Sequence, residues 1–130
     1  MVDRAASCSV MAPFERFTAW QHSHRLVVEV YRATGRWPVS ERFGLAGQVR
    51  RAAVSIPTNI AEGSAKRGSR EFRRYLDIAL GSLAELTYLL RLACDLGYLE
   101  QNEFERVEQA RDEAGRHVWR LYESLRPPPS

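Results

Sequence analysis

Residues 50–69 read RRAAVSIPTNIAEGSAKRGS, and this stretch decides how the fold is interpreted. Small apolar residues recur in it at the three- and four-residue spacings of a buried helix face, yet Pro57 lies in their midst. A proline inside a helix removes one backbone hydrogen bond and clashes with the carbonyl four residues earlier, here that of Ala53. We therefore predict a helix that kinks or restarts at Pro57, with Ser55 as the cap of a restart.

The helix around this stretch is predicted over residues 41–65, with Ser40 as its N-cap and Glu41 in its first turn. A helix with small or apolar residues on two sides needs two neighbours, so this one is expected to contact both its own bundle and a second subunit. The inner face holds Leu45, Val49, Ala52, Ala53, Ile56, Ile60 and Gly63. The strip nearly opposite holds Gly47, Val54, Ala61 and Ala65.

A polar stripe runs beside the inner face of the same helix. It consists of Gln48, Arg51, Ser55, Asn59, Glu62 and Lys66. One interpretation is a solvated helix edge. The other is a partly buried network, formed by Arg51, Ser55, Asn59 and Glu62, that sets the register between helices or subunits.

An earlier amphipathic helix is predicted over residues 14–34. It ends at Gly35, and the Trp37–Pro38 pair then requires an extended or turn connection. The main apolar stripe is expected to be Phe17, Trp20, His24, Val27 and Tyr31, with His24 packed and hydrogen-bonded. Almost opposite lie Ala19, Leu26 and Val30, which again suggests self-association.

Two further helices are predicted over residues 69–95 and 100–125. Ser69 is a good N-cap for the first, and Gly97 ends it. Its inward stripe is Phe72, Tyr75, Leu76, Ala79, Leu83, Leu86, Leu90 and Ala93, and its solvated side carries Arg70, Arg73, Arg74 and Asp77. The last helix points Phe104, Val107, Ala114, Val118, Leu121 and Leu125 inward. Four amphipathic helices with short connections predict an all-α, antiparallel up-and-down four-helix bundle.

Length and composition predict a single domain. A chain of 130 residues with 45% hydrophobic content can build one core, so the bundle is expected over residues 14–126, after a disordered leader (1–13) and before a Pro-rich tail (127–130). No apolar run approaches the ~18 residues of a membrane span, which predicts a cytoplasmic protein with no membrane partner. Cys8 and Cys94 are expected to stay reduced.

Charge is distributed unevenly along the chain. Residues 41–74 hold eight basic side chains and three acidic ones, whereas residues 75–130 hold six basic and ten acidic ones. The alternative to a functional patch is an Arg-rich composition in a protein with a single lysine. We predict a patch for polyanions, with phosphates contacted by six side chains: Arg50, Lys66, Arg67, Arg70, Arg73 and Arg74.

Little in the sequence supports a phosphate-binding loop, a metal site or a catalytic centre. The segment GSAKRGS (63–69) lacks the order of a phosphate-binding P-loop, and no strand precedes it. His22 and His24 face different sides of a helix, and His117 is assigned no carboxylate or cysteine partner, so no metal is predicted. No serine has a nucleophile-elbow context and no acid/base pair is evident, so we predict a protein without catalytic residues or cofactors.

The runs WPVSERFGLAGQVRRAAVSIPTNIAEG (37–63) and SREFRRYLDIALGSLAELTYLLRLACDLGYL (69–99) resemble the bacterial 23S rRNA intervening-sequence proteins. The resemblance implies a four-helix bundle that assembles as a homopentamer. It also implies a distant similarity to the accessory protein of diversity-generating retroelements, a basic pentamer that binds nucleic acid and a reverse transcriptase. Glu100 departs from the family pattern, where Ser or Asp usually caps the last helix.

Two functions follow from these observations. The first is a non-enzymatic homo-oligomer that binds nucleic acid, RNA in preference to DNA, through its basic surface. The second is an adaptor or accessory subunit for a protein partner such as a reverse transcriptase or another nucleic-acid enzyme. A small enzyme would need ionisable side chains that converge in one pocket, and no such group is evident in the sequence.

Overall fold

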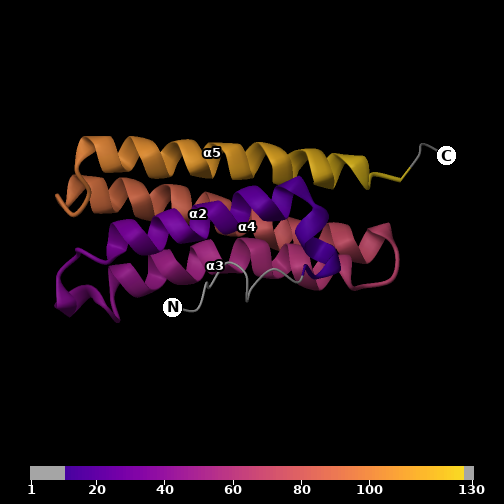
Figure 1. Cartoon of the computed structure of the whole chain (residues 1–130), viewed down its shortest axis with the longest axis horizontal. Coiled ribbons are helices and arrows are strands. Elements are labelled where there is room, and N and C mark those ends of the chain that lie inside the picture. Colours follow the sequence, from indigo (N-terminus) through magenta and orange to yellow (C-terminus); the bar gives the residue numbers. More distant parts are fainter. Residues whose placement is uncertain (1–10, 128–130) are drawn as a thin grey trace, which may run out of the picture.

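The computed structural model describes residues 11–127 of the chain, and over that range it is all helical, with four long helices and no strand. The long helices are α2 (Thr18–Thr34), α3 (Leu45–Ser64), α4 (Ser69–Asp95) and α5 (Gln101–Ser124). Two short 3₁₀ helices, η1 (Pro13–Arg16) and η2 (Val39–Glu41), precede α2 and α3. Figure 1 shows the four long helices lying side by side along the length of the molecule. The all-helical fold class is therefore confirmed.

Each long helix packs against two others: α3 against α2 and α4, and α5 against α2 and α4. Contacts between distant residues show how the helix ends meet. Thr18 near the start of α2 lies against His117 near the end of α5, with 3.2 Å between Thr18 Oγ1 and His117 Nδ1. At the other end of α2, Arg36 lies 3.8 Å from Glu103 in the first turn of α5.

Helices α3 and α4 contribute to the core the inner faces that were predicted for them. Every residue predicted on the inner face of α3 is buried, and on α4 only Tyr75 is half-buried rather than buried. Ile56 and Ile60 are fully enclosed, and each such side chain contributes about 1.5–3 kcal/mol through removal of apolar surface from water. In α5 the predicted inner residues Val107, Ala114 and Val118 are buried, whereas Phe104, Leu121 and Leu125 are half-buried.

Helix α2 buries a different stripe from the one predicted, and the prediction was correct only in part: Phe17, Trp20 and Val27 are half-buried against the core. The buried residues of α2 are Ala19, Ser23, Leu26, Val30, Ala33 and Thr34, which include the three residues expected on the opposite side. Tyr31 and His24 are exposed, and His24 is not packed in the core but stacks on Trp20 with ring centroids 4.9 Å apart. Both stripes have helical spacing, and the close approach of α3 and α5 selects the one with smaller side chains.

The start of α3 also differs from the prediction. Ser40 lies within η2 and does not cap the helix, which begins at Leu45 after Gly44. The carboxylate of Glu41 takes the capping role instead, because its Oε1 accepts a hydrogen bond from the Leu45 amide at 3.0 Å. Its Oε2 accepts a second bond, at 2.8 Å, from the Tyr98 hydroxyl in the turn between α4 and α5.

Pro57 does not interrupt α3, which continues from Leu45 to Ser64. The side chain of Ser55 accordingly caps no restart; it bonds to Ser82 on α4 at 2.8 Å. The predicted N-cap Ser69 is the first residue of α4, preceded by Gly68 at a φ of 86°. The predicted stop is confirmed: Gly97 adopts a φ of 80°, and the Tyr98 amide reaches back to the Ala93 carbonyl at 2.9 Å.

The last helix does follow Glu100, whose own amide bonds to Glu103 at 3.3 Å. Residues 1–10 of the predicted leader and 128–130 of the predicted tail lie outside the described residues, as does Cys8. Cys94 forms no disulfide within the described range. None of the helices described has both the length and the apolar character needed to cross a membrane.

Candidate functional site

Four of the predicted phosphate-binding residues lie exposed at the end of the molecule where α3 turns into α4. Lys66 and Arg67 belong to that turn, and Arg70 and Arg74 lie in the first turns of α4. The ammonium of Lys66 lies 5.6 Å and the guanidinium of Arg74 5.4 Å from the centroid of the Tyr75 ring. Arg74 also lies 3.5 Å from the carboxylate of Glu71. We call Lys66, Arg67, Arg70 and Arg74 the basic end.

Arg73, by contrast, is not a solvated side chain as expected. It is half-buried between α4 and α5, and its guanidinium lies 4.1 Å from the centroid of the Tyr122 ring. Its Nε also donates a hydrogen bond to the Tyr122 carbonyl at 3.3 Å. These contacts tie the start of α4 to the last turn of α5, so Arg73 supports the packing of the two helices.

Arg126 was not among the predicted phosphate-binding residues, yet it lies beside them. A hollow of about 650 Å³ separates the start of α4 from the end of α5, lined by Ser69, Arg70, Arg73, Ser124, Leu125, Arg126 and Pro127. Arg126 also pairs with Glu123 at 3.7 Å. An up-and-down bundle brings the last residues of α5 to the α3–α4 turn, so the predicted topology was the signal that could have added Arg126.

Arg50 lies apart from the basic end. It is in the second turn of α3, and the remainder of that helix extends for about 20 Å before the turn is reached. Its Nε donates to Thr34 Oγ1 at 2.8 Å, and its guanidinium covers the Tyr31 ring at 4.8 Å. Arg50 thus packs α3 against the end of α2.

The predicted polar network exists in a smaller form. Asn59 Nδ2 donates to the Ser55 carbonyl at 2.7 Å and lies 3.0 Å from Ser55 Oγ, which in turn bonds to Ser82 Oγ on α4. Ser82 was not predicted as a member. Arg51 and Glu62 are exposed and make no hydrogen bond or ion pair with this group in the part of the chain described. The structure therefore brings together Ser55 and Asn59 only, and joins them to α4 of the same bundle.

A third group was missed from the sequence. His22 on α2 faces Glu113 and His117 on α5, and all three are half-buried. The prediction that His117 has no carboxylate partner is wrong, since Glu113 precedes it by four residues, a spacing that places both on one helix face. Burial lowers the pKa of His117, as do the neighbouring His22 and Arg120, while Glu113 opposes them.

The sequence profile of the 23S rRNA-intervening sequence protein family matches residues 15–120, which is most of the chain. The chain belongs to this family. The resemblance noted in residues 37–63 and 69–99 is thereby confirmed.

One solved structure with the same fold is that of a protein of unknown function from the S23 ribosomal protein family of Bacteroides thetaiotaomicron. Its TM-score to this member of the intervening-sequence family is 0.74 at 21% identity, covering 81% of this chain and 95% of the other. At that identity the likeness establishes the shared fold alone. None of the curated proteins compared with the chain matches it.

Proposed function

We propose that this intervening-sequence family member is a non-enzymatic, cytoplasmic homo-oligomer that binds nucleic acid, RNA in preference to DNA, through its basic end. The observation that carries the proposal is the grouping of Lys66, Arg67, Arg70 and Arg74 at one end of the bundle. Arg67 and Arg70 are exposed there and make no ion pair within residues 11–127. Unpaired guanidinium groups are well suited to bind backbone phosphates.

Oligomerisation would strengthen such a site. Four cations per chain make a weak binding surface, but several copies held together bind one polyanion with much greater avidity. We propose an antiparallel bundle assembled as a homopentamer, as the family resemblance implies. The strip of Gly47, Val54, Ala61 and Ala65 supports subunit contact through α3, because Val54 remains 38% exposed on the face away from the core.

The test is fluorescence anisotropy with labelled single-stranded RNA and DNA of matched length, over a range of salt concentrations. Wild-type protein should bind RNA more tightly, and the observed association constant should fall steeply with salt. The double variant Arg67→Glu/Arg70→Glu should lower affinity by about tenfold or more at low salt and reduce the salt slope by about 2 per chain.

Arg91→Glu is the matched control. Arg91 is an exposed arginine of α4 that pairs with Asp95 at 3.4 Å, towards the end of the helix away from the basic end. Its reversal should leave binding nearly unchanged. The proposal fails if wild-type protein shows no salt-sensitive binding to either polymer, or if the Arg91→Glu variant loses as much affinity as the double variant.

A protein partner is the second candidate function, and one observation favours it. The end of the molecule away from the basic end presents Val39, Phe43 and Leu96, which are 85%, 92% and 53% exposed. Exposed apolar side chains of this size often mark a contact with another protein. Such an adaptor would serve a reverse transcriptase or another nucleic-acid enzyme, and co-elution of the two purified proteins on size exclusion, abolished by Phe43→Ser, would support it.

A further inference from the structure

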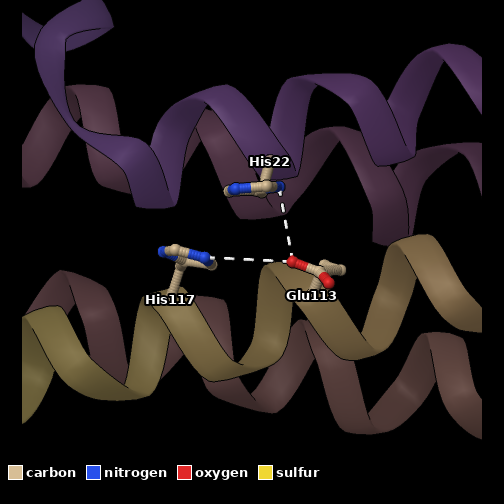
Figure 2. Close-up of side chains that lie close together, drawn as sticks. All are labelled: His22, Glu113 and His117. Carbon is tan, nitrogen blue, oxygen red and sulfur yellow. Dashed lines mark ion pairs between the residues drawn. The ribbon is translucent and has the colours of Figure 1, made fainter.

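Two histidines and a glutamate meet where α2 packs against α5. Figure 2 shows His22 from α2 facing Glu113 and His117, which lie one turn apart on α5. His22 Nδ1 and His117 Nε2 each lie 3.9 Å from Glu113 Oε2. The candidate ligand atoms of the three residues all lie within 4.8 Å of one another. The group is thus compact and draws on both helices.

Neighbouring side chains orient two of these residues towards the common centre. His117 Nδ1 lies 3.2 Å from Thr18 Oγ1, and a proton donated there leaves the Nε2 lone pair facing Glu113. Arg116 donates to Glu113 Oε1 at 3.1 Å, which leaves Oε2 facing both imidazoles. Hydrogen bonds of this kind, to the atoms that do not bind the ion, hold ligands in place in metal sites.

The imidazole rings supply a further indication. The rings of His22 and His117 stack with centroids 4.1 Å apart and planes 20° from parallel. Two protonated imidazoles at this separation would repel each other, so the arrangement disfavours a doubly charged pair, and a neutral imidazole is the form that binds metals.

We propose that His22, Glu113 and His117 bind a borderline transition-metal ion, with Zn²⁺ as the reference ion, and that the ion joins α2 to α5. Two imidazoles and a carboxylate are a known zinc ligand set, whereas Mg²⁺ and Ca²⁺ prefer oxygen ligands alone. The adjoining hollow of about 290 Å³, which His22 and Glu113 help to line, has room for a water molecule as a fourth ligand.

Binding requires a modest rearrangement. Bonds of about 2.0–2.1 Å to a tetrahedral ion place ligand atoms about 3.3 Å apart, so the present separations must shorten and the stacked rings must turn. Arg25 and Arg106 line the same hollow, and their positive charge opposes a divalent ion. The affinity expected is therefore moderate, with a dissociation constant of about 1–100 μM.

The experiment uses the full chain, freed of any affinity tag and of metal by dialysis against a chelator. Zn²⁺ is titrated by calorimetry, and Co²⁺ is added as a probe whose visible absorption reports tetrahedral coordination. One ion per chain is expected, and His22→Gln, Glu113→Gln and His117→Gln should each weaken binding by about tenfold or more. Zn²⁺ should also raise the melting temperature of wild-type protein but not of these variants.

His24→Gln is the matched control, because His24 lies on the same helix but is exposed and stacks on Trp20. It should bind Zn²⁺ as wild-type protein does. The proposal is overturned if no saturable binding is observed, or if wild-type and His22→Gln protein bind equally, which would place the ion elsewhere on the chain. Circular dichroism tests whether each variant is folded. Because the three ligands are substituted separately, the other variants still decide the question if one variant does not fold.

Discussion

Gly63 on α3 lies directly against Tyr75 on α4, so closely that a methyl group on Gly63 would stand 2.7 Å from Tyr75 Cβ and 2.9 Å from Phe72 Cδ1. Tyr75 Cβ is fixed to the helix backbone and cannot move aside. The absence of a side chain at Gly63 thus sets how closely α3 and α4 approach just before the turn that carries Lys66 and Arg67.

Gly63→Ala should destabilise the protein. Alanine favours a helix by about 1 kcal/mol over glycine, but forcing a methyl group into this contact costs about 1–3 kcal/mol and moves the helices apart. We expect a net loss in the free energy of unfolding, measured by chemical denaturation.

The control for this substitution is Gly81→Ala, in the middle of α4, where an added Cβ would meet no atom within 4 Å. That variant should gain up to about 1 kcal/mol from helix propensity. Equal changes in both variants would contradict the close packing of Gly63.

Arg73 and Arg70 should respond differently to removal of their side chains. Arg73→Ala loses the stacking on Tyr122 and the bond to its carbonyl, and should cost about 1–2 kcal/mol of unfolding free energy. Arg70 is exposed, so Arg70→Ala should change stability by less than about 0.5 kcal/mol. Thermal or chemical denaturation of the two variants side by side measures the difference. If Arg73→Ala is as stable as wild-type protein, Arg73 does not support the helix packing and belongs with the exposed basic residues that are available to bind phosphate.

The bond between Glu41 and Tyr98 should make stability depend on pH at both extremes. The Leu45 amide and the Tyr98 hydroxyl lower the pKa of Glu41 from its ordinary value of 4.5, so its contribution is present above that pH and is lost as pH falls through the folded value. The carboxylate of Glu41 raises the pKa of Tyr98 from 10.0, so that contribution is present below pH 10 and is lost as pH rises through the folded value.

Tyr98→Phe tests this pair. The melting temperature of the variant should fall furthest below that of wild-type protein between about pH 5 and 9, and the difference should shrink in acid and in alkali. Tyr88→Phe, at an exposed tyrosine of α4, serves as the control and should follow the wild-type profile. A Tyr98→Phe difference that does not vary with pH would contradict the role of the bond.

Two buried serines should give opposite results when replaced by alanine. Ser23 Oγ is fully buried on α2 with no hydrogen-bond partner among the described residues, so Ser23→Ala should stabilise the protein by about 1 kcal/mol. Ser82 bonds to Ser55 across the α3–α4 contact, so Ser82→Ala should destabilise it by about 1 kcal/mol. Denaturation curves of both variants check the pair, and a Ser23→Ala protein less stable than wild type would show that its hydroxyl has a partner.

Periodicity in the sequence was sufficient to predict the four long helices and the inner faces of α3 and α4. Leu45, Val49, Ile56 and Ile60 on α3 follow one helical stripe, and only one face of that helix is rich in large aliphatic residues. The stop at Gly97 was also evident, because a glycine is favoured where the chain must adopt a positive φ. Two long motifs, in residues 37–63 and 69–99, were sufficient to indicate the family, and the profile match confirms it.

Tertiary structure alone decided the features that depend on which helices meet. α2 carries two stripes of equal period, and its neighbours bury the one with Leu26 and Val30 because smaller side chains allow closer packing. Arg73 has helical spacing typical of a solvated position, yet Tyr122 lies 49 residues away in the chain and covers it. His22 and His117 are likewise remote in sequence, so only the contact between α2 and α5 brings them together. Local spacing determines which residues share a helix face, whereas contacts between helices determine what that face touches.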